Sequence, residues 1–317
     1  MSKSSLALCV LGAALVATAA PAHAGNGTDL LKFVPEQSQL VMVFDMGGAR
    51  GSGLLQKGFS QLLAAAPDAK TKLAELGLDP MKDIDTILFA GGSAKGLSKD
   101  SMQDVLIIVE GRLPKDKLST IPDATSSTYA GVTIFTSKDT DAAFIGDRMY
   151  FAKKGKLKAE IDLVLGKGKA KGKSVATSKR AKAMKAAIAA ADTKAHLWAA
   201  VLIPASAQAD MKKEGMAAST VTFGMKFTAD LAIGLKLVTD SADSAAKIVG
   251  MAQAQLGQVT SAASSMGLTK AAKSLMVAAD GPVVKLNLAL TEAELTSIMN
   301  LAKQFGGMAA KGAAGNP

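Results

Sequence analysis

Residues 221–237, VTFGMKFTADLAIGLKL, alternate apolar side chains with small or polar ones on both sides of a short turn. Every second residue is apolar, both before Ala229-Asp230 and after it. A period of two is that of a β-strand with one face on a core and the other in water. The stretch therefore predicts an antiparallel hairpin.

The same kind of pattern continues toward the C-terminus. Apolar spacing predicts a helix over 242–265, a strand pair over 274–290 and a further helix to about residue 305. Thr291 and Glu294 have the spacing of a capping box, which marks the start of that last helix. The order strand, strand, helix thus occurs twice in this part of the chain.

A similar order is found earlier, over 86–120 and 132–165. It matches the later part in the order of elements rather than in residues, and it indicates an internal duplication. Short strand pairs packed under helices are typical of the α+β class. We therefore predict an α+β fold of mainly antiparallel sheets covered by helices, in two similar halves of repeated strand-strand-helix units.

The first 24 residues have the order of a secretory signal peptide. Lys3 is followed by an apolar run over 6–16 and by Ala22-His23-Ala24, which has small residues at the two positions needed for cleavage. The apolar run is shorter than the roughly 20 residues that span a bilayer. We expect export to the periplasm or the extracellular space, and no transmembrane segment after signal removal.

The expected segments follow from these patterns and from a change in composition at residue 166. They are a signal peptide (1–24), a first α+β half (25–165), a flexible Lys/Gly-rich connector (166–178), a second α+β half (179–305) and a flexible tail (306–317). The only cysteine, Cys9, lies in the signal peptide, so no disulfide is expected. Aromatic residues make up only 4% of the chain, which predicts an aliphatic core.

The positive charge is concentrated in one place. Between Lys153 and Lys194 there are 13 Lys or Arg and three Asp or Glu, a balance of +10 that equals the formal net charge of the whole chain. The candidates for anion binding are Lys167, Lys169, Lys171, Lys173, Lys179, Arg180, Lys182 and Lys185. We expect anionic lipid headgroups or acidic envelope polymers as partners. Nucleic acid is not expected, because no aromatic residues are interleaved for base stacking. A solvated linker is the alternative interpretation.

Two serines lie in patterns related to those of hydrolases. Ser93 follows a predicted strand but lacks the glycine that a nucleophile elbow needs two residues later. Ser244 and Lys247 have S-x-x-K spacing without its companion motifs. After the signal peptide the only histidine is His196. We therefore expect a protein that is not an enzyme and has no metal or cofactor.

A further set of features lies near the start of the first half. Phe33-Val34-Pro35 leads into a strand ending at Asp45, and a helix is followed by residues 77–85, GLDPMKDID. In these features residues 33–91 resemble the start of a group of exported bacterial proteins of unknown function. The resemblance implies an envelope protein, and it brings no catalytic residue to this chain.

These observations leave three hypotheses about function. The first is a non-enzymatic exported binding or scaffold protein of the cell envelope, with a basic patch for anionic surfaces. The second is a serine hydrolase using Ser93 or Ser244 with lysine assistance. The third is a carrier that holds a small apolar ligand between sheet and helices, for which a closed apolar cavity would be the sign.

Overall fold

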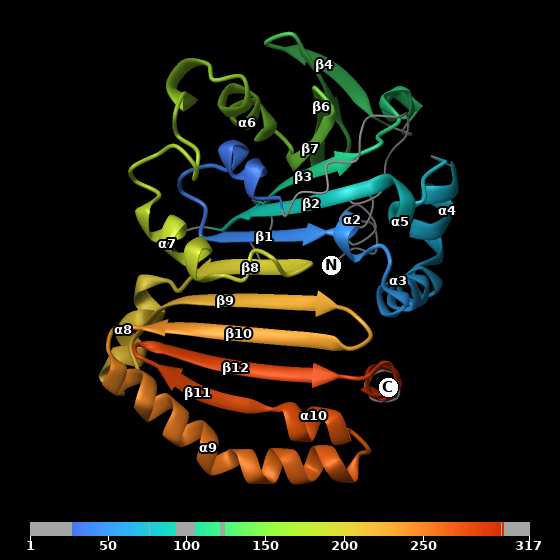
Figure 1. Ribbon diagram of the computed structural model, residues 1–317. Coiled ribbons are helices and arrows are strands. Elements are labelled where there is room, and N and C mark those ends of the chain that lie inside the picture. Colours follow the sequence, from blue (N-terminus) through green and yellow to red (C-terminus); the bar gives the residue numbers. More distant parts are fainter. Residues whose placement is uncertain (1–26, 76, 93–104, 121–123, 299, 301–317) are drawn as a thin grey trace, which may run out of the picture.

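The computed structural model describes residues 27–75, 77–92, 105–120, 124–298 and 300. The predicted signal peptide and tail lie outside this part of the chain. The fold mixes helices with one large antiparallel sheet (Figure 1), which confirms the predicted class. A single continuous sheet takes the place of the separate sheets that we expected.

Seven strands come from the first half of the chain: β1 (Leu40–Asp45), β2 (Ile84–Gly91), β3 (Val105–Gly111), β4 (Thr125–Tyr129), β5 (Val132–Thr136), β6 (Thr140–Ile145) and β7 (Arg148–Lys153). Five come from the second: β8 (Leu197–Leu202), β9 (Ala218–Phe227), β10 (Leu231–Thr239), β11 (Met276–Asp280) and β12 (Val283–Leu290). The strand order is β11-β12-β10-β9-β8-β1-β2-β3-β7-β6-β5-β4.

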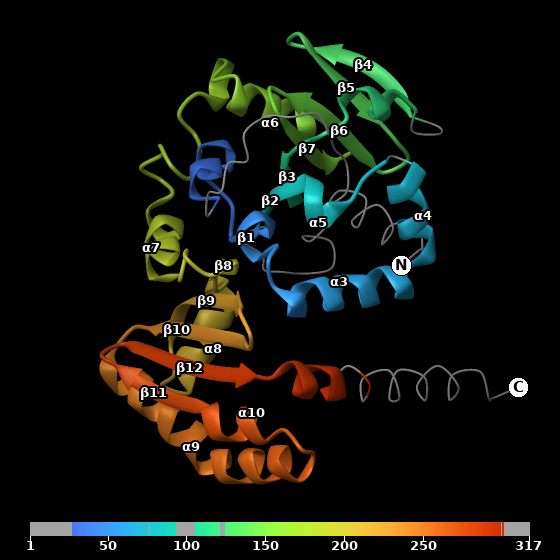
Figure 2. The ribbon, with the colours of Figure 1, turned by 45° about the vertical axis from the view of Figure 1, so that its right-hand side comes forward.

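Helices cover both faces of the sheet (Figure 2). One face carries η1 (Thr28–Phe33), α6 (Leu157–Val164) and α7 (Lys182–Ala190). The other carries α2 (Met46–Ala49), α3 (Gly53–Ala65), α4 (Pro67–Glu75) and α5 (Pro80–Asp83) over the first half, and α9 (Ala242–Ser265) and α10 (Thr269–Ser274) over the second. The remaining short helices are η3 (Lys115–Thr120), η4 (Gly168–Ala170) and α8 (Ala205–Lys213).

The two halves meet where β1 pairs with β8. Leu40–Phe44 and Leu197–Val201 form an antiparallel ladder in which Val43 stands opposite Trp198. Both of these side chains are 0% exposed, and they belong to one core cluster with residues of η1, α6 and α7. The halves therefore share a hydrophobic core as well as a sheet.

The strand order is similar on the two sides of this contact. From the contact outward, β1-β2-β3 and β8-β9-β10 follow the sequence order, and the hairpins β7-β6 and β12-β11 come next in reverse order. The connections differ, because α9, of 24 residues, and α10 join β10 to the second hairpin, whereas η3 is the one helix between β3 and β4 among the described residues. The internal duplication stays a prediction.

We predict that the two halves unfold together. Trp198 is the only tryptophan, so its fluorescence reports on the contact, while far-UV circular dichroism reports on the whole fold. In urea both signals should give one midpoint. Val43→Ala should shift both midpoints equally and lower the free energy of unfolding by about 2 kcal/mol. Two separate transitions would show that the halves are independent domains.

Candidate functional site

The candidate basic residues lie on the connection between α6 and α7 and on α7 itself. Residues 163–191 contain eight Lys or Arg and no Asp or Glu. Lys169 belongs to η4. The other seven are exposed: Lys167, Lys171, Lys173, Lys179, Arg180, Lys182 and Lys185. We call residues 167–185 the basic segment.

The cations of the basic segment have almost no carboxylate partners. Arg180 Nη1 lies 3.9 Å from Glu36 Oε1, a long and exposed contact. Among the residues that the structure describes, no carboxylate forms an ion pair with the six exposed lysines. The segment therefore presents uncompensated positive charge to solvent.

Part of the basic segment is held against the fold by its backbone. Glu36 N donates to Lys173 O at 2.8 Å, and Val175 N donates to Val34 O at 2.7 Å. Ser174 and Val175 are each 1% exposed. In contrast to the expected flexible connector, residues 173–178 are thus packed on residues 31–36, and the lysines flank an anchored stretch.

Ser178 stands shortly before α7 but does not cap it. The N-cap of that helix is Ala181, without a side-chain hydrogen bond. The Ser178 hydroxyl instead donates to Glu36 Oε2 and accepts from Arg180 N at 3.1 Å. The hydroxyl is therefore bonded to a carboxylate that lies 142 positions earlier in the chain, and it does not cap the helix.

Limited proteolysis tests the anchoring. Within the basic segment, trypsin should cleave the native protein fastest after Lys167, Lys169 or Lys171 and more slowly after Lys179, because a chain bound by hydrogen bonds must open before it is cut. Glu36→Ala should speed cleavage after Lys179, since it removes the acceptor for Ser178. Fragment masses over time give the rates.

The control for this experiment is Glu292→Ala, which removes an exposed carboxylate paired with Lys57 on another part of the surface. It should leave the cleavage rates in the basic segment unchanged. Equal cleavage rates after Lys171 and Lys179 in the native protein would mean that residues 173–178 are not anchored.

Ser244 and Lys247 have separate hydrogen-bond partners. The Ser244 hydroxyl donates to Asp240 Oδ1 at 2.7 Å and lies 3.0 Å from Ser241 Oγ, at the start of α9. This hydrogen bond lowers the pKa of Asp240. The Lys247 amine donates to Glu214 O. Both groups thus serve the helix start and its neighbouring loop. Ser93 lies outside the described residues.

His196 also has a structural role. Its Nδ1 accepts a hydrogen bond from Phe227 N at 2.9 Å, and its ring stacks on Phe227 with 6.2 Å between centroids. Within the described ranges, no group of three or more His, Cys, Asp or Glu side chains is placed to hold a metal ion.

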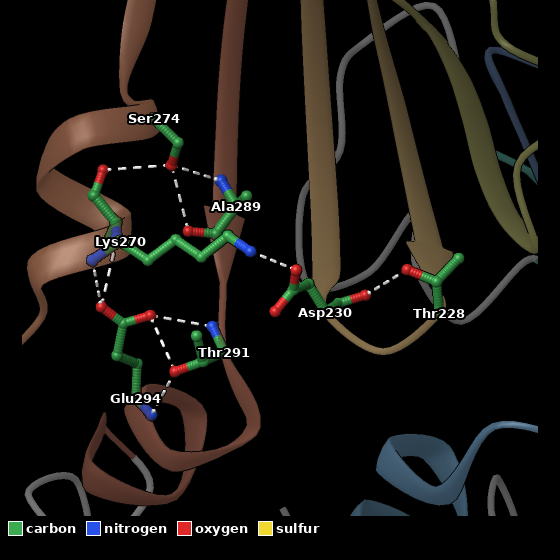
Figure 3. A network of polar contacts seen from close by, with 8 residues as sticks. Thr228, Asp230, Lys270, Ser274, Ala289, Thr291 and Glu294 are labelled. Atoms are coloured by element: carbon green, nitrogen blue, oxygen red, sulfur yellow. Dashed lines mark hydrogen bonds and ion pairs between the residues drawn. The ribbon is translucent and has the colours of Figure 1, made fainter.

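A network of polar contacts lies beside β12 (Figure 3). Thr291 N donates to Glu294 Oε2 at 2.8 Å, and Glu294 N donates to Thr291 Oγ1 at 3.2 Å, which confirms the predicted capping box. The other carboxylate oxygen accepts from Lys270 N at 2.6 Å and Ala271 N at 3.2 Å. One glutamate therefore caps two helices, α10 and the helix that follows β12.

An open concavity of about 580 Å³ adjoins this network and is lined by Thr269, Lys270, Lys273, Ser274, Glu294 and Ser297. The Lys270 amine pairs with Asp230, and Ser274 Oγ accepts from Ala289 N at 2.8 Å. These polar groups are already engaged in holding α10 to the sheet. The polar groups beside this concavity therefore have a structural role.

Replacing Glu294 tests the double cap. Burial raises the pKa of Glu294, but hydrogen bonds from Thr291, Ala271 and Lys270 lower it more, so the pKa lies below the ordinary 4.5. Glu294→Gln should lower the free energy of unfolding at pH 7 by about 1–2 kcal/mol. Because the folded pKa is depressed, the charged form's contribution is present above the unfolded pKa and is lost as the pH falls through the folded pKa.

The measurement is urea unfolding of both proteins between pH 7 and pH 3. The difference in the free energy of unfolding between wild type and Glu294→Gln should become smaller toward pH 3. Glu292→Gln, on the same helix and exposed, should change stability by less than about 1 kcal/mol. A gap that stays constant with pH would show that the carboxylate charge is not what caps the helices.

A second concavity, a groove of about 410 Å³, lies on the α7 face of the sheet. Its wall is formed by Ala183, Ala186 and Ala190 of α7, and by Pro204 and Ala205 where α8 begins. Sequence reasoning missed this groove. The signal was the spacing of the three alanines, which places them on one side of a helix apart from both the lysines and the core residues.

No helix among the described residues combines the length and the apolar character needed to cross a membrane. No protein-family model matches the chain, and no curated protein sequence does.

Solved structures of TP0453 are distantly similar to this chain. Crystal form I is 11% identical, with a TM-score of 0.49 over 86% of this chain and 96% of that one. Crystal form III is 9% identical, with a TM-score of 0.48 over 85% and 96%. Crystal form IV is 10% identical, with a TM-score of 0.43 over 85% and 95%. TM-scores below 0.5 at such identities do not establish a shared fold or function.

Proposed function

We propose that this protein is an exported, non-enzymatic binding or scaffold protein of the cell envelope, and that its basic segment binds anionic surfaces. The observation that carries the proposal is the set of six exposed lysines without carboxylate partners among the described residues: Lys167, Lys171, Lys173, Lys179, Lys182 and Lys185. The signal-peptide pattern supports the location.

The anchoring of residues 173–178 matters for binding. Lysines on a free linker lose conformational entropy when they settle on a surface, whereas here the backbone next to Lys173 and Lys179 is already ordered. Each lysine close to an anionic membrane contributes about 1 kcal/mol. Several such residues on one segment are therefore enough for reversible attachment.

The hydrolase alternative is not favoured. Ser244 donates to Asp240, and the lysine that the motif needs is held by the carbonyl of Glu214. The hydrogen bond from Ser244 lowers the pKa of Asp240, which makes this carboxylate a weak general base for activating the serine hydroxyl. We therefore propose that the protein has no catalytic activity.

The test is binding of the purified mature chain, residues 25–317, to vesicles of neutral lipid with and without anionic lipid, across a salt series. Binding to the anionic vesicles should weaken steeply with salt. Changing Lys167, Lys171, Lys173 and Lys179 to Gln should weaken it by about two to three orders of magnitude, at about 1 kcal/mol per lysine.

The matched control changes Lys70, Lys138, Lys212 and Lys273 to Gln. These four are exposed, without an ion pair among the described residues, and scattered over both halves. Both variants lose the same net charge. A much smaller loss of vesicle binding in the control variant would therefore assign binding to the basic segment. Equal losses in both variants would mean that only net charge matters, and no binding by the wild type would refute the proposal.

A further inference from the structure

The groove beside α7 has a floor that crosses the contact between the two halves. Leu202 stands opposite Thr220 in the β8–β9 ladder, and Thr220 stands opposite Val238 in the β9–β10 ladder. Leu202 N donates to Gln39 O at 2.8 Å, which brings the residue just before β1 into the same row. The row spans three strand spacings, about 14 Å, and all four residues line the groove.

The wall of the groove is the third face of α7. Met184 and Ile188 point into the core, while Lys182 and Lys185 are exposed. Ala183, Ala186 and Ala190 line the groove between these two faces (Figure 1 shows α7 and α8 at the same end of β8 and β9). Small side chains here leave room between helix and sheet that larger ones would fill.

Positive charge stands at both ends of this wall. Lys182 is exposed and stands four residues before Ala186, which lines the groove. Residues four apart are neighbours on a helix surface, so the Lys182 amine can reach the groove from beside its lining. Lys236 Nζ donates to Ala190 O at 2.7 Å, at the other end of α7. The lining contains no Asp or Glu. Asp192, beside Lys236, already pairs with Lys226 at 2.8 Å.

The floor also carries a polar side chain. Thr220 is 6% exposed and lines the groove between Leu202 and Val238. An apolar wall, a hydroxyl in the floor and flanking cations together suit a molecule with an alkyl chain and an anionic head.

We propose that this groove binds a single fatty acid, with the alkyl chain against the alanines of α7 and the carboxylate near Lys182. A volume of about 410 Å³ lies within the range of small-molecule sites, roughly 300–1,000 Å³. The proposal goes beyond attachment to a surface, because it concerns one dissolved molecule and a different face of α7. It develops the carrier hypothesis with an open groove in place of the expected closed cavity.

The test is isothermal titration of the mature chain with dodecanoate, below the concentration at which micelles form and without vesicles. We expect one site per chain, and at least tenfold weaker binding of dodecyltrimethylammonium, which has the same chain and the opposite charge. Ala186→Leu should weaken dodecanoate binding at least tenfold by filling the groove. Lys182→Gln should weaken it about fivefold, the size of one exposed charge contact.

Matched controls lie on the same helix. Ala189→Leu adds the same bulk on an exposed position outside the groove, and Lys185→Gln removes the same charge on the side away from it. Both should bind dodecanoate within about twofold of wild type, because neither residue lines the groove. Unchanged thermal unfolding of Ala186→Leu without ligand would show that the variant is folded.

Three outcomes would overturn the proposal. The first is no uptake of dodecanoate by the wild type, which is expected if another part of the chain or a second copy fills the groove. The second is binding by Ala186→Leu as tight as by the wild type. The third is equally tight binding of the cationic amphiphile. The surface proposal fails separately: the four-lysine variant, which keeps Lys182 and Ala186, should still bind dodecanoate, and Ala186→Leu should still bind anionic vesicles.

Discussion

The antiparallel pairing of β1 with β8 is the contact on which the rest of the architecture depends. Both strands are apolar on their two faces, LVMVFD and LWAAVL. Such strands belong in the middle of a sheet, because at an edge they would expose unpaired backbone and apolar side chains to other chains. Pairing them buries Val43 and Trp198 completely and satisfies both backbones at once. The entropy of closing a long loop grows only slowly with its length, so strands this far apart in sequence can be joined.

This pairing also explains the path of the basic segment. The chain leaves β7, which is four strand spacings from β8, or about 19 Å. It must therefore cross the face of the sheet over β3, β2 and β1 before it can enter β8. The crossing runs past residues 31–36, where Ser174 and Val175 become buried and their neighbours find backbone partners. Lysine side chains suit this crossing, because their charged ends stay in water while the backbone lies on the protein.

Sequence patterns predicted the parts of the fold that depend on local order. The hairpin of residues 221–237 is present with Leu231 opposite Phe227, because alternation over two adjacent strands fixes both face and register. The capping box at Thr291 was predicted because its two partners are three residues apart. The strand β4 was missed, since Thr125–Tyr129 is an exposed edge with no apolar alternation.

What the sequence did not predict depends on contacts between distant residues. Ser178 has the residue type and position of a helix cap, yet its hydroxyl is taken by Glu36, and nothing near Ser178 in the sequence indicates this. The pairing of β1 with β8 was missed for the same reason. In strands that are apolar on both faces, the sequence pattern does not indicate which other strand each one pairs with. The lysines were found as candidates because charge is visible residue by residue.

The lysines could be predicted from the sequence and the groove could not, because the groove depends on contacts between distant residues. Alanine is compatible with a core, a surface or a cavity wall, so Ala183, Ala186 and Ala190 alone indicate only a good helix former. They become a wall because β8, β9 and β10 pass beneath α7, with Thr220 and Val238 in one row. Those strands are there because β8 pairs with β1. The charge on α7 is therefore a property of its sequence, whereas the groove is a property of the sheet, and a ligand that needs both can be inferred only from the folded chain.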